Sequence, residues 1–165
     1  MASQRFEVVL EKQTLIFSAA HFITFGDNVC ESIHGHNYRV ACRIGGQLDS
    51  LHAYVIDFIW LRDALHRITQ TLDHKVLLPD RHPSIEVRQD NNEFEVTFEE
   101  RRWVFPSQDV MLLPVDNTTA ERLAEYIAGE LLEQLDQIEG LQPEKVAVGV
   151  DENEGQWAWC ELLVQ

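Results

Sequence analysis

The alternating stretch from Tyr38 to Ile44 constrains the fold of this chain more than any other segment. Successive side chains of a β-strand point to opposite faces of a sheet, so residues two apart share a face. One face of this stretch carries Tyr38, Val40, Cys42 and Ile44, and the other carries Arg39, Ala41 and Arg43. Gly45-Gly46 follows and ends the pattern. The segment therefore predicts a β-strand with one apolar face.

Two amphipathic helices are predicted, one in each half of the chain. The first follows the N-cap residue Asp57, and its apolar residues recur at steps of three and four: Phe58, Leu61, Leu65, Ile68 and Leu72. The second begins near Thr118, and Glu121 three residues later completes a capping box. Its apolar face carries Ala120, Leu123, Ala124, Ile127, Leu131 and Leu135, and Gly140 and Pro143 end it.

Further strands are predicted on both sides of the helices. Arg5 to Ile16 alternates through Phe6, Val8 and Leu10 and is followed by an apolar run to Phe22. The stretches 145–150 and 157–164 predict a closing strand pair, and 86–105 predicts a β-hairpin with a turn at Asn91-Asn92. The order β-β-α-α-β-β predicts one α+β domain over 1–165, in which an antiparallel sheet carries both helices on one face. The hairpin belongs to an insert of about 78–115 between the helices.

Charge and composition limit the class of protein. The chain has 165 residues, of which 13 are basic and 28 acidic, for a net charge of −15. So acidic a chain is poorly suited to nucleic acid or to anionic membranes. No apolar run of about 18 residues is present, and the first residues, 1–7, carry no apolar signal core. The cysteines, Cys30, Cys42 and Cys160, are too sparse for a disulfide framework. We therefore expect a cytoplasmic protein.

The segment His34-Gly-His36 is the sharpest chemical feature. Two histidines at positions i and i+2 of a strand point to the same face, close enough to bind one metal ion. His21, at the end of the preceding strand, becomes a third ligand if the two strands pair. Three neutral imidazoles leave a fourth zinc position open, as in a catalytic site. The alternative is that these histidines pack as partly buried rings without a metal.

Two further groups have the chemistry of an active site. Cys30 lies four residues before His34 and is a fourth zinc ligand, a small buried apolar residue, or a thiol activated by a nearby cation. Asp73-His74 directly follows the first helix, and a carboxylate beside an imidazole orients it for proton transfer. His74 is equally explained as a cation at a helix C-terminus. We expect Cys42 and Cys160 to lie in the core.

An ordered set of motifs spans nearly the whole chain outside the insert. It comprises Phe17-Ser-Ala-Ala-His21, Cys30-x-x-x-His34-Gly-His36-Asn-Tyr38, Val55-Ile-Asp57-Phe58, Leu72-Asp-His74 and Thr119-Ala-Glu121. This set resembles the 6-pyruvoyltetrahydropterin synthase and 6-carboxytetrahydropterin synthase family. The resemblance implies the tunnelling fold, in which subunits form trimers, two trimers stack into a homohexamer, and active sites lie between subunits.

The resemblance also implies the roles of individual residues. His21, His34 and His36 match the zinc ligands, Cys30 the catalytic thiol, Asp73 and His74 the partner acid–base pair, and Glu152 the carboxylate that anchors the pterin. Thr119 and Glu121 match positions at the pterin pocket, although a helix cap explains both. Asn153 stands where the family usually has threonine. Lys75, Arg39, Arg101 and Arg102 are candidates to offset a substrate triphosphate in so acidic a chain.

The predicted activity is that of a zinc-dependent 6-carboxytetrahydropterin synthase, a lyase acting on 7,8-dihydroneopterin triphosphate for queuosine precursor synthesis. The three-residue gap between Cys30 and His34 resembles that branch, and the pyruvoyl branch usually has a longer gap. Glu31, directly after Cys30, resembles a variant of the family motif whose enzymes also release 6-hydroxymethyl-7,8-dihydropterin for folate. In that variant Glu31 would be an added acid–base group. The alternative is that Glu31 is a solvated carboxylate in a loop. A non-catalytic zinc- or pterin-binding module is the hypothesis from another class.

Overall fold

The computed structural model describes residues 4–27 and 29–164. The first three of the residues 1–7, which were predicted to carry no apolar signal core, therefore lie outside the described ranges. The main sheet has the spatial order β11-β10-β4-β1-β5-β9. Its strands are β1 (Phe6–His21), β4 (His34–Gly46), β5 (Lys75–Pro79), β9 (Val110–Leu113), β10 (Pro143–Asp151) and β11 (Trp157–Leu163). The predicted strands β1, β4, β10 and β11 pair antiparallel. At one edge β5, which leads into the insert, pairs parallel with β1, and β9 of the insert pairs parallel with β5.

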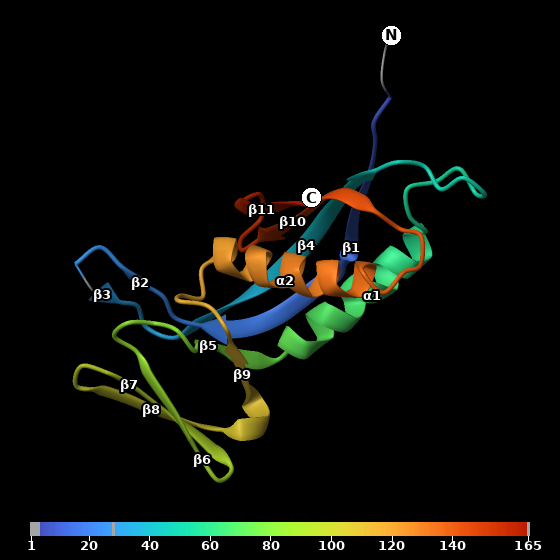
Figure 1. Ribbon diagram of the computed structural model, residues 1–165. Coiled ribbons are helices and arrows are strands. Elements are labelled where there is room, and N and C mark those ends of the chain that lie inside the picture. The colour runs from blue at the N-terminus through green and yellow to red at the C-terminus, as the bar shows by residue number, and fades with distance from the viewer. Residues whose placement is uncertain (1–3, 28, 165) are drawn as a thin grey trace.

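Both helices cover the same face of the main sheet, as predicted (Figure 1). Helix α1 (Phe58–Leu72) begins at Asp57, whose side chain accepts a hydrogen bond from the Ile59 amide. The apolar stripe of α1 is buried with one exception, because Phe58 is half exposed on the first turn. The core between sheet and helices contains, among others, Phe17, Tyr38, Cys42, Leu65, Leu123 and Val148.

Helix α2 (Ala120–Leu135) begins one residue later than the capping-box pattern predicted. Its N-cap is Thr119, whose side chain accepts a hydrogen bond from the Arg122 amide at 3.4 Å. The predicted box between Thr118 and Glu121 is therefore wrong. The Thr118 hydroxyl instead donates to the Phe22 carbonyl, so a tertiary contact has taken the group that the local pattern assigned to the cap.

Strand β1 contains a wide irregularity in its pairing with β4. Glu11 lies opposite Ala41 and Ile16 opposite Arg39, so the four residues from Lys12 to Leu15 stand against Val40 alone. The even-numbered residues of β4 face the core. Their partners in β1 are even-numbered before this bulge and odd-numbered after it, so the core-facing residues of β1 change from even to odd. The change of parity brings Phe17 and His21 to the same face as Leu10.

The insert contains a meander of β6 (Glu86–Asp90), β7 (Glu93–Phe98) and β8 (Arg101–Pro106), so the predicted hairpin has a further strand. The predicted turn at Asn91-Asn92 joins β6 to β7. The meander stands off the end of the main sheet, beside the small hairpin of β2 (Thr24–Phe25) and β3 (Val29–Cys30) (Figure 1). A 3-10 turn, η1 (Ser107–Asp109), returns the chain to β9.

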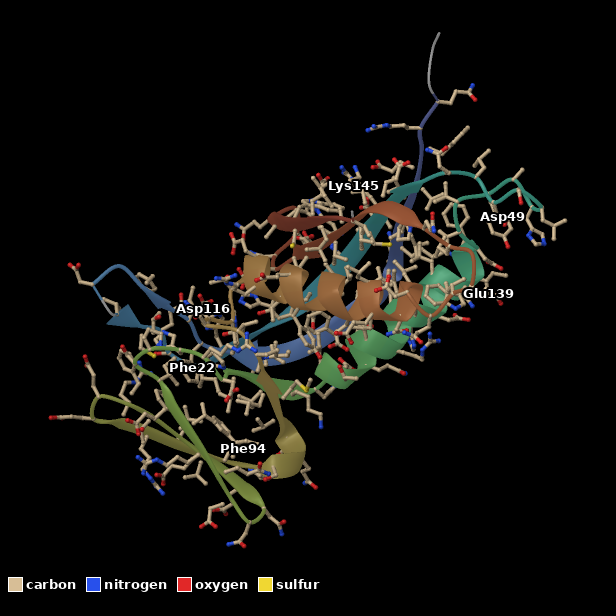
Figure 2. All side chains as sticks on the ribbon, in the orientation of Figure 1. Phe22, Asp49, Phe94, Asp116, Glu139 and Lys145 are labelled. Atoms are coloured by element: carbon tan, nitrogen blue, oxygen red, sulfur yellow. The ribbon has the colours of Figure 1, made fainter. Side chains whose placement is uncertain are left out.

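The meander packs on a second hydrophobic core, which contains Phe22, Leu78, Ile85, Phe94, Val96 and Phe98. Phe22 directly follows β1, and Phe94 comes from β7 (Figure 2). Most apolar residues of the insert are thus covered within one chain, whereas Val104 stays exposed. Within the described ranges, no helix is long and apolar enough to span a membrane.

Candidate metal centre and active site

The three histidines lie together where the end of β1 meets the start of β4. His21 lies directly opposite His34, and His36 lies opposite Ala19 on the same face. One ring nitrogen from each of the three histidines lies within 4.8 Å of the others. The ring centroids are 4.7 Å apart for His21 and His34 and 4.8 Å apart for His34 and His36. The predicted set of candidate ligands is therefore assembled by strand pairing.

Backbone carbonyls orient two of the rings. His21 Nδ1 lies 2.8 Å from the Thr118 carbonyl oxygen, and His34 Nδ1 lies 3.0 Å from that of Ser32. A carbonyl oxygen only accepts hydrogen bonds, so each Nδ1 must carry a proton, and Nε2 is the nitrogen left to bind a metal ion. Metal-binding histidines are commonly held in this way, with the second nitrogen donating to a carbonyl or carboxylate.

The free nitrogens fit a metal ion. Among the described residues, His21 Nε2 and His36 Nε2 are buried atoms that have no hydrogen-bond partner. Burial, reinforced by the neighbouring His34 and His36, lowers the pKa of His21 to about 4, against an opposing hydrogen bond to Thr118. His21 is therefore a neutral imidazole at pH 7, the form that binds zinc. The neutral imidazole of His21, the buried unpartnered Nε2 of His36 and a nearby ring nitrogen of His34 together fit a three-histidine metal site.

Glu152 lies beside the same nitrogens. Its Oε1 is 3.4 Å from His21 Nε2 and 3.7 Å from His36 Nε2. The carboxylate predicted to anchor the pterin thus borders the candidate metal position. The hydroxyl of Tyr38 is also buried without a hydrogen-bond partner in the described chain, and burial followed by the charge of Glu152 raises its pKa.

A buried aspartate holds the turn that carries Glu152. Asp151 accepts hydrogen bonds from the Gly155 and Gln156 amides, at 3.0 and 2.9 Å, and from Arg39 Nε at 2.9 Å. Gly155 has φ +93°, which favours glycine at this turn. Burial opposes the negative charge of Asp151, but these hydrogen bonds and Arg39 outweigh it and hold the pKa of Asp151 below its usual value.

Cys30 and Glu31 lie on and just after β3. Glu31 Oε2 is 3.8 Å from His34 Nδ1, which places this carboxylate at the edge of the histidine cluster. Cys30 is half-buried and packs against the second core. Burial raises the pKa of the Cys30 thiol, and the charges of Glu31 and Glu99 add to this, whereas the charge of Arg101 opposes it.

Asp73 and His74 form a pair, as predicted, but they face the other side of the sheet. His74 Nδ1 lies 2.8 Å from Asp73 Oδ2, and Asp73 Oδ1 accepts a hydrogen bond from the Ser18 amide. The His74 side chain is 83% exposed. It borders an open hollow of about 540 Å³ that is lined by Ser18, Ala20, Gly35 and Asn37, the residues that alternate with the histidines along β1 and β4.

The remaining predicted residues have structural partners. Thr119 caps α2, and Glu121 is exposed on its first turn. Of the basic candidates, Arg39 pairs with Asp151, Lys75 donates to the Gln108 carbonyl, Arg102 pairs with Glu95, and Arg101 donates to the Cys30 carbonyl. Sequence reasoning missed Thr118, because its contribution to the site is a backbone carbonyl and leaves no residue-type pattern.

A larger cavity lies away from these residues. It has a volume of about 850 Å³, and its lining includes Asp49, Tyr54, Trp60 and Glu139 but none of the three histidines. Asp49 and Glu139 lie at the opposite end of the domain from Phe94 of the meander (Figure 2). The fold and the site together define an α+β protein with a candidate three-histidine metal centre at the end of its sheet where the meander is attached.

Sequence comparison identifies the family. The profile of the 6-pyruvoyl tetrahydropterin synthase family matches residues 11–162, so the chain belongs to this family of enzymes acting on pterin side chains. A protein of Methanocaldococcus jannaschii, provisionally named a 6-carboxy-5,6,7,8-tetrahydropterin synthase, is 34% identical over 87% of this chain and 88% of its own length. A protein of Pyrococcus abyssi with the same provisional name is 30% identical over 71% of this chain and 69% of its own.

Solved structures confirm the tunnelling fold. The 6-pyruvoyltetrahydropterin synthase of Plasmodium vivax superposes with a TM-score of 0.89 and 29% identity, covering 98% of this chain and 100% of that one. The Plasmodium falciparum enzyme superposes with a TM-score of 0.90 and 26% identity over the same shares of the two chains. Two further Plasmodium vivax structures carry alanine or cysteine in place of a glutamate described as a catalytic residue.

Proposed function

We propose that this protein is a zinc-dependent 6-carboxy-5,6,7,8-tetrahydropterin synthase. The substrate would be 7,8-dihydroneopterin triphosphate, and the reaction would serve queuosine precursor synthesis in the cytoplasm. The observation that carries the proposal is the convergence of His21, His34 and His36 beside Glu152 and Glu31, with buried unpartnered Nε2 atoms on His21 and His36. The provisional names of the archaeal relatives favour the carboxytetrahydropterin product.

The chain's own residues divide the work of binding and proton transfer. His21, His34 and His36 would hold zinc, which as a Lewis acid makes a hydroxyl of the substrate more acidic. Glu152 would accept the adjacent ring N–H and amino donors of the pterin, which a carboxylate binds in a fork. Cys30 would remove or return a proton on the substrate side chain. Burial keeps Cys30 largely protonated at neutral pH, so its local electrostatic environment matters for this role.

The second candidate product is 6-hydroxymethyl-7,8-dihydropterin, formed by cleavage of the side chain. Glu31 favours this alternative, because its carboxylate lies 3.8 Å from His34 and can act as an acid or base beside the candidate metal. The Plasmodium vivax enzyme also uses a catalytic glutamate, which supports a comparable role for Glu31. A 6-pyruvoyltetrahydropterin product is the third possibility, named after the family itself.

A non-catalytic zinc- or pterin-binding module is the alternative from another class. A binding module needs ligands for the ion and the pterin, but it has no use for Cys30 and Glu31 as proton-transfer groups beside the histidines. Zinc content together with tight pterin binding, but without any turnover, would favour this alternative.

We further propose that the protein assembles as a homohexamer of two trimers. In one chain, His74 borders a hollow beside Ser18, Ala20, Gly35 and Asn37, which alternate with the histidines along β1 and β4, so a second copy would have to bring the Asp73–His74 pair to the ring side of a metal centre. The edge strands β9 and β11 also leave backbone groups unpaired within one chain, and such edges are normally paired or covered. Thr119 and Glu121 would then border the pterin pocket from the start of α2.

Product analysis tests the proposed function. The zinc-loaded protein is incubated with 7,8-dihydroneopterin triphosphate, and the pterins are separated and identified by mass. We expect 6-carboxy-5,6,7,8-tetrahydropterin as the main product.

Cys30→Ala should retain zinc and lose most turnover, and release of zinc by this variant would instead make Cys30 a ligand. Glu31→Gln should selectively reduce any 6-hydroxymethyl product, and equal loss of both products would remove Glu31 from a branch-specific role.

A further inference from the structure

Arg101 links the meander to the segment that carries Cys30 and Glu31. It is the first residue of β8, and its Nη1 donates a hydrogen bond of 2.8 Å to the Cys30 carbonyl oxygen. The guanidinium also lies over the ring of Trp103, 4.6 Å from the ring centroid. A planar cation of this kind is well suited to stacking on an aromatic ring while its N–H groups remain directed at an acceptor.

The contacts of Arg101 continue to the metal centre. Trp103 stacks on Phe22, with ring centroids 4.8 Å apart and an interplanar angle of 18°. Phe22 directly follows His21 in the chain and is almost fully buried. A continuous series of contacts therefore runs from the Cys30 carbonyl through Arg101 and Trp103 to the residue next to a candidate ligand.

This series closes a ring around the Cys30–Glu31 segment. On its other side the segment is held by the Glu31 amide, which donates a 3.0 Å hydrogen bond to the Ile23 carbonyl, and by the pairing of Cys30 with Thr24. Arg101 thus adds a contact from the meander to a segment that is also held by the short hairpin next to His21 and by the packing of Cys30 against the second core. The residue that does so is separated from Cys30 by 71 positions in the sequence.

Arg101 also brings charge to a region dominated by acids. Glu31 and Glu99 raise the pKa of the Cys30 thiol on top of the effect of burial, and Arg101 is the cation that opposes them. A neighbouring cation stabilises the thiolate, which is the reactive form of cysteine. Arg102, one residue further along β8, points to the exposed side and pairs with Glu95.

We propose that Arg101 is a positioning residue of the active site, which holds the Cys30–Glu31 segment beside the histidines and promotes the reactivity of the Cys30 thiol. The expected effect of Arg101 on turnover rests on the proposed function, in which Cys30 transfers a proton. The expected effect of Arg101 on the Cys30 thiol does not rest on it, because thiol reactivity can be measured without substrate. The meander would then belong to the active site through Arg101.

The test compares Arg101→Gln with Arg102→Gln as the matched control. Alkylation of Cys30 by iodoacetamide is followed from pH 6 to pH 10 by peptide-resolved mass spectrometry, which separates Cys30 from Cys42 and Cys160. The pH midpoint of the rate reports the thiol pKa, and the high-pH plateau reports access to the thiol. Circular dichroism verifies the fold of each variant, and the partial exposure of Arg101 makes loss of the fold unexpected.

Arg101→Gln should move the midpoint upward and slow alkylation at pH 7 by about threefold to tenfold, as expected when a thiol pKa rises by about half a unit to one unit. Arg102→Gln should leave the midpoint unchanged. Arg101→Lys, which keeps the charge, should restore most of the rate. An unchanged midpoint in Arg101→Gln overturns the proposal, even if the plateau changes. A lysine variant as slow as the glutamine variant overturns its electrostatic part.

Activity separates this inference from the proposed function. If the wild-type protein converts the pterin, Arg101→Gln should lower kcat with little change in KM and in zinc content. An unchanged kcat would show that Arg101 does not act on catalysis. If the wild-type protein converts no pterin but the midpoint shifts as expected, the positioning role of Arg101 stands and the proposed function fails.

Discussion

Replacing Asp151 by asparagine should destabilise the protein far more than its conservative size suggests. The side chain is fully buried and accepts hydrogen bonds from the Gly155 and Gln156 amides and from Arg39. Asparagine keeps the shape but loses the charge, and its NH₂ group must face one of these donors. The change therefore weakens every hydrogen bond at the site and leaves one donor without an acceptor.

The magnitude follows from these contacts. A hydrogen bond to a charged group contributes about 1.5–3 kcal/mol and a neutral one about 0.5–1.5 kcal/mol, so three bonds lose roughly 1 kcal/mol each. An unsatisfied buried donor adds a further penalty, which the partial exposure of Arg39 reduces because water can reach its guanidinium. We expect the free energy of unfolding to fall by about 3–5 kcal/mol.

Urea denaturation of wild type and Asp151→Asn at pH 7 measures this loss. Asp116→Asn is the matched control, because Asp116 also pairs with an arginine, Arg122, but is 50% exposed. Such a surface pair contributes about 0–1 kcal/mol. If Asp151→Asn costs no more than Asp116→Asn, burial does not strengthen the Asp151 contacts and the reasoning is wrong.

The pH dependence gives a second test. The pKa of Asp151 is lowered in the folded protein, so the unfolded chain binds its proton first as the pH falls. The stability from the ionised side chain is fully present above the unfolded-state pKa of about 3.9 and is lost as the pH falls through the lower folded-state value. The difference between wild type and Asp151→Asn should therefore be constant from pH 7 to pH 5 and shrink below about pH 4. A difference that stays constant to pH 3 would contradict the assignment.

Three further predictions follow from other parts of the structure. His34→Ala should reduce zinc content to near zero by elemental analysis, and chelation should abolish turnover while circular dichroism stays unchanged, because the histidines lie on strands held by the core. Burial lowers the pKa of His82, whose Nδ1 accepts a hydrogen bond from the Ile85 amide. This hydrogen bond is therefore stable above about pH 6.5, the pKa of an unfolded histidine. Below that pH the amide hydrogen exchange of Ile85, corrected for the intrinsic effect of pH on exchange, should accelerate. Replacing 86–105 by a short Gly-Ser bridge should abolish activity and cause aggregation visible by light scattering, because the replacement uncovers Phe22. An unchanged oligomer with full activity would show that the meander is not needed.

The sequence predicted the parts of the fold that depend on local periodicity. The alternation from Tyr38 to Ile44 and the stripes of both helices correspond to buried faces, apart from Phe58. His34 and His36 could be placed on one face for the same reason. The role of His21 depended on strand pairing, which the sequence left conditional and the register of β1 with β4 decided.

Other features depended on tertiary contacts that leave no local pattern. The box from Thr118 to Glu121 fits the capping rule, yet Thr118 serves β1 and the cap falls to Thr119. The stretch 86–105 was predicted as one hairpin, but it belongs to three strands, and alternate residues of the third strand, β8, meet the second core. The Asp73–His74 pair was correct as a pair, whereas its position relative to the histidines depends on how copies of the chain associate.

The bulge in β1 gives that strand room for a change of length ahead of the candidate metal ligands. If Lys12, Gln13 and Thr14 were deleted, Leu15 would stand directly opposite Val40, and Leu10 and Phe17 would keep Cys42 and Tyr38 as their partners in an uninterrupted ladder. His21 would still face inward. Changes of length upstream of Leu15 can thus be absorbed before they reach the metal ligands. Tags and fusions joined at this end of the chain should accordingly leave the geometry of the three histidines intact.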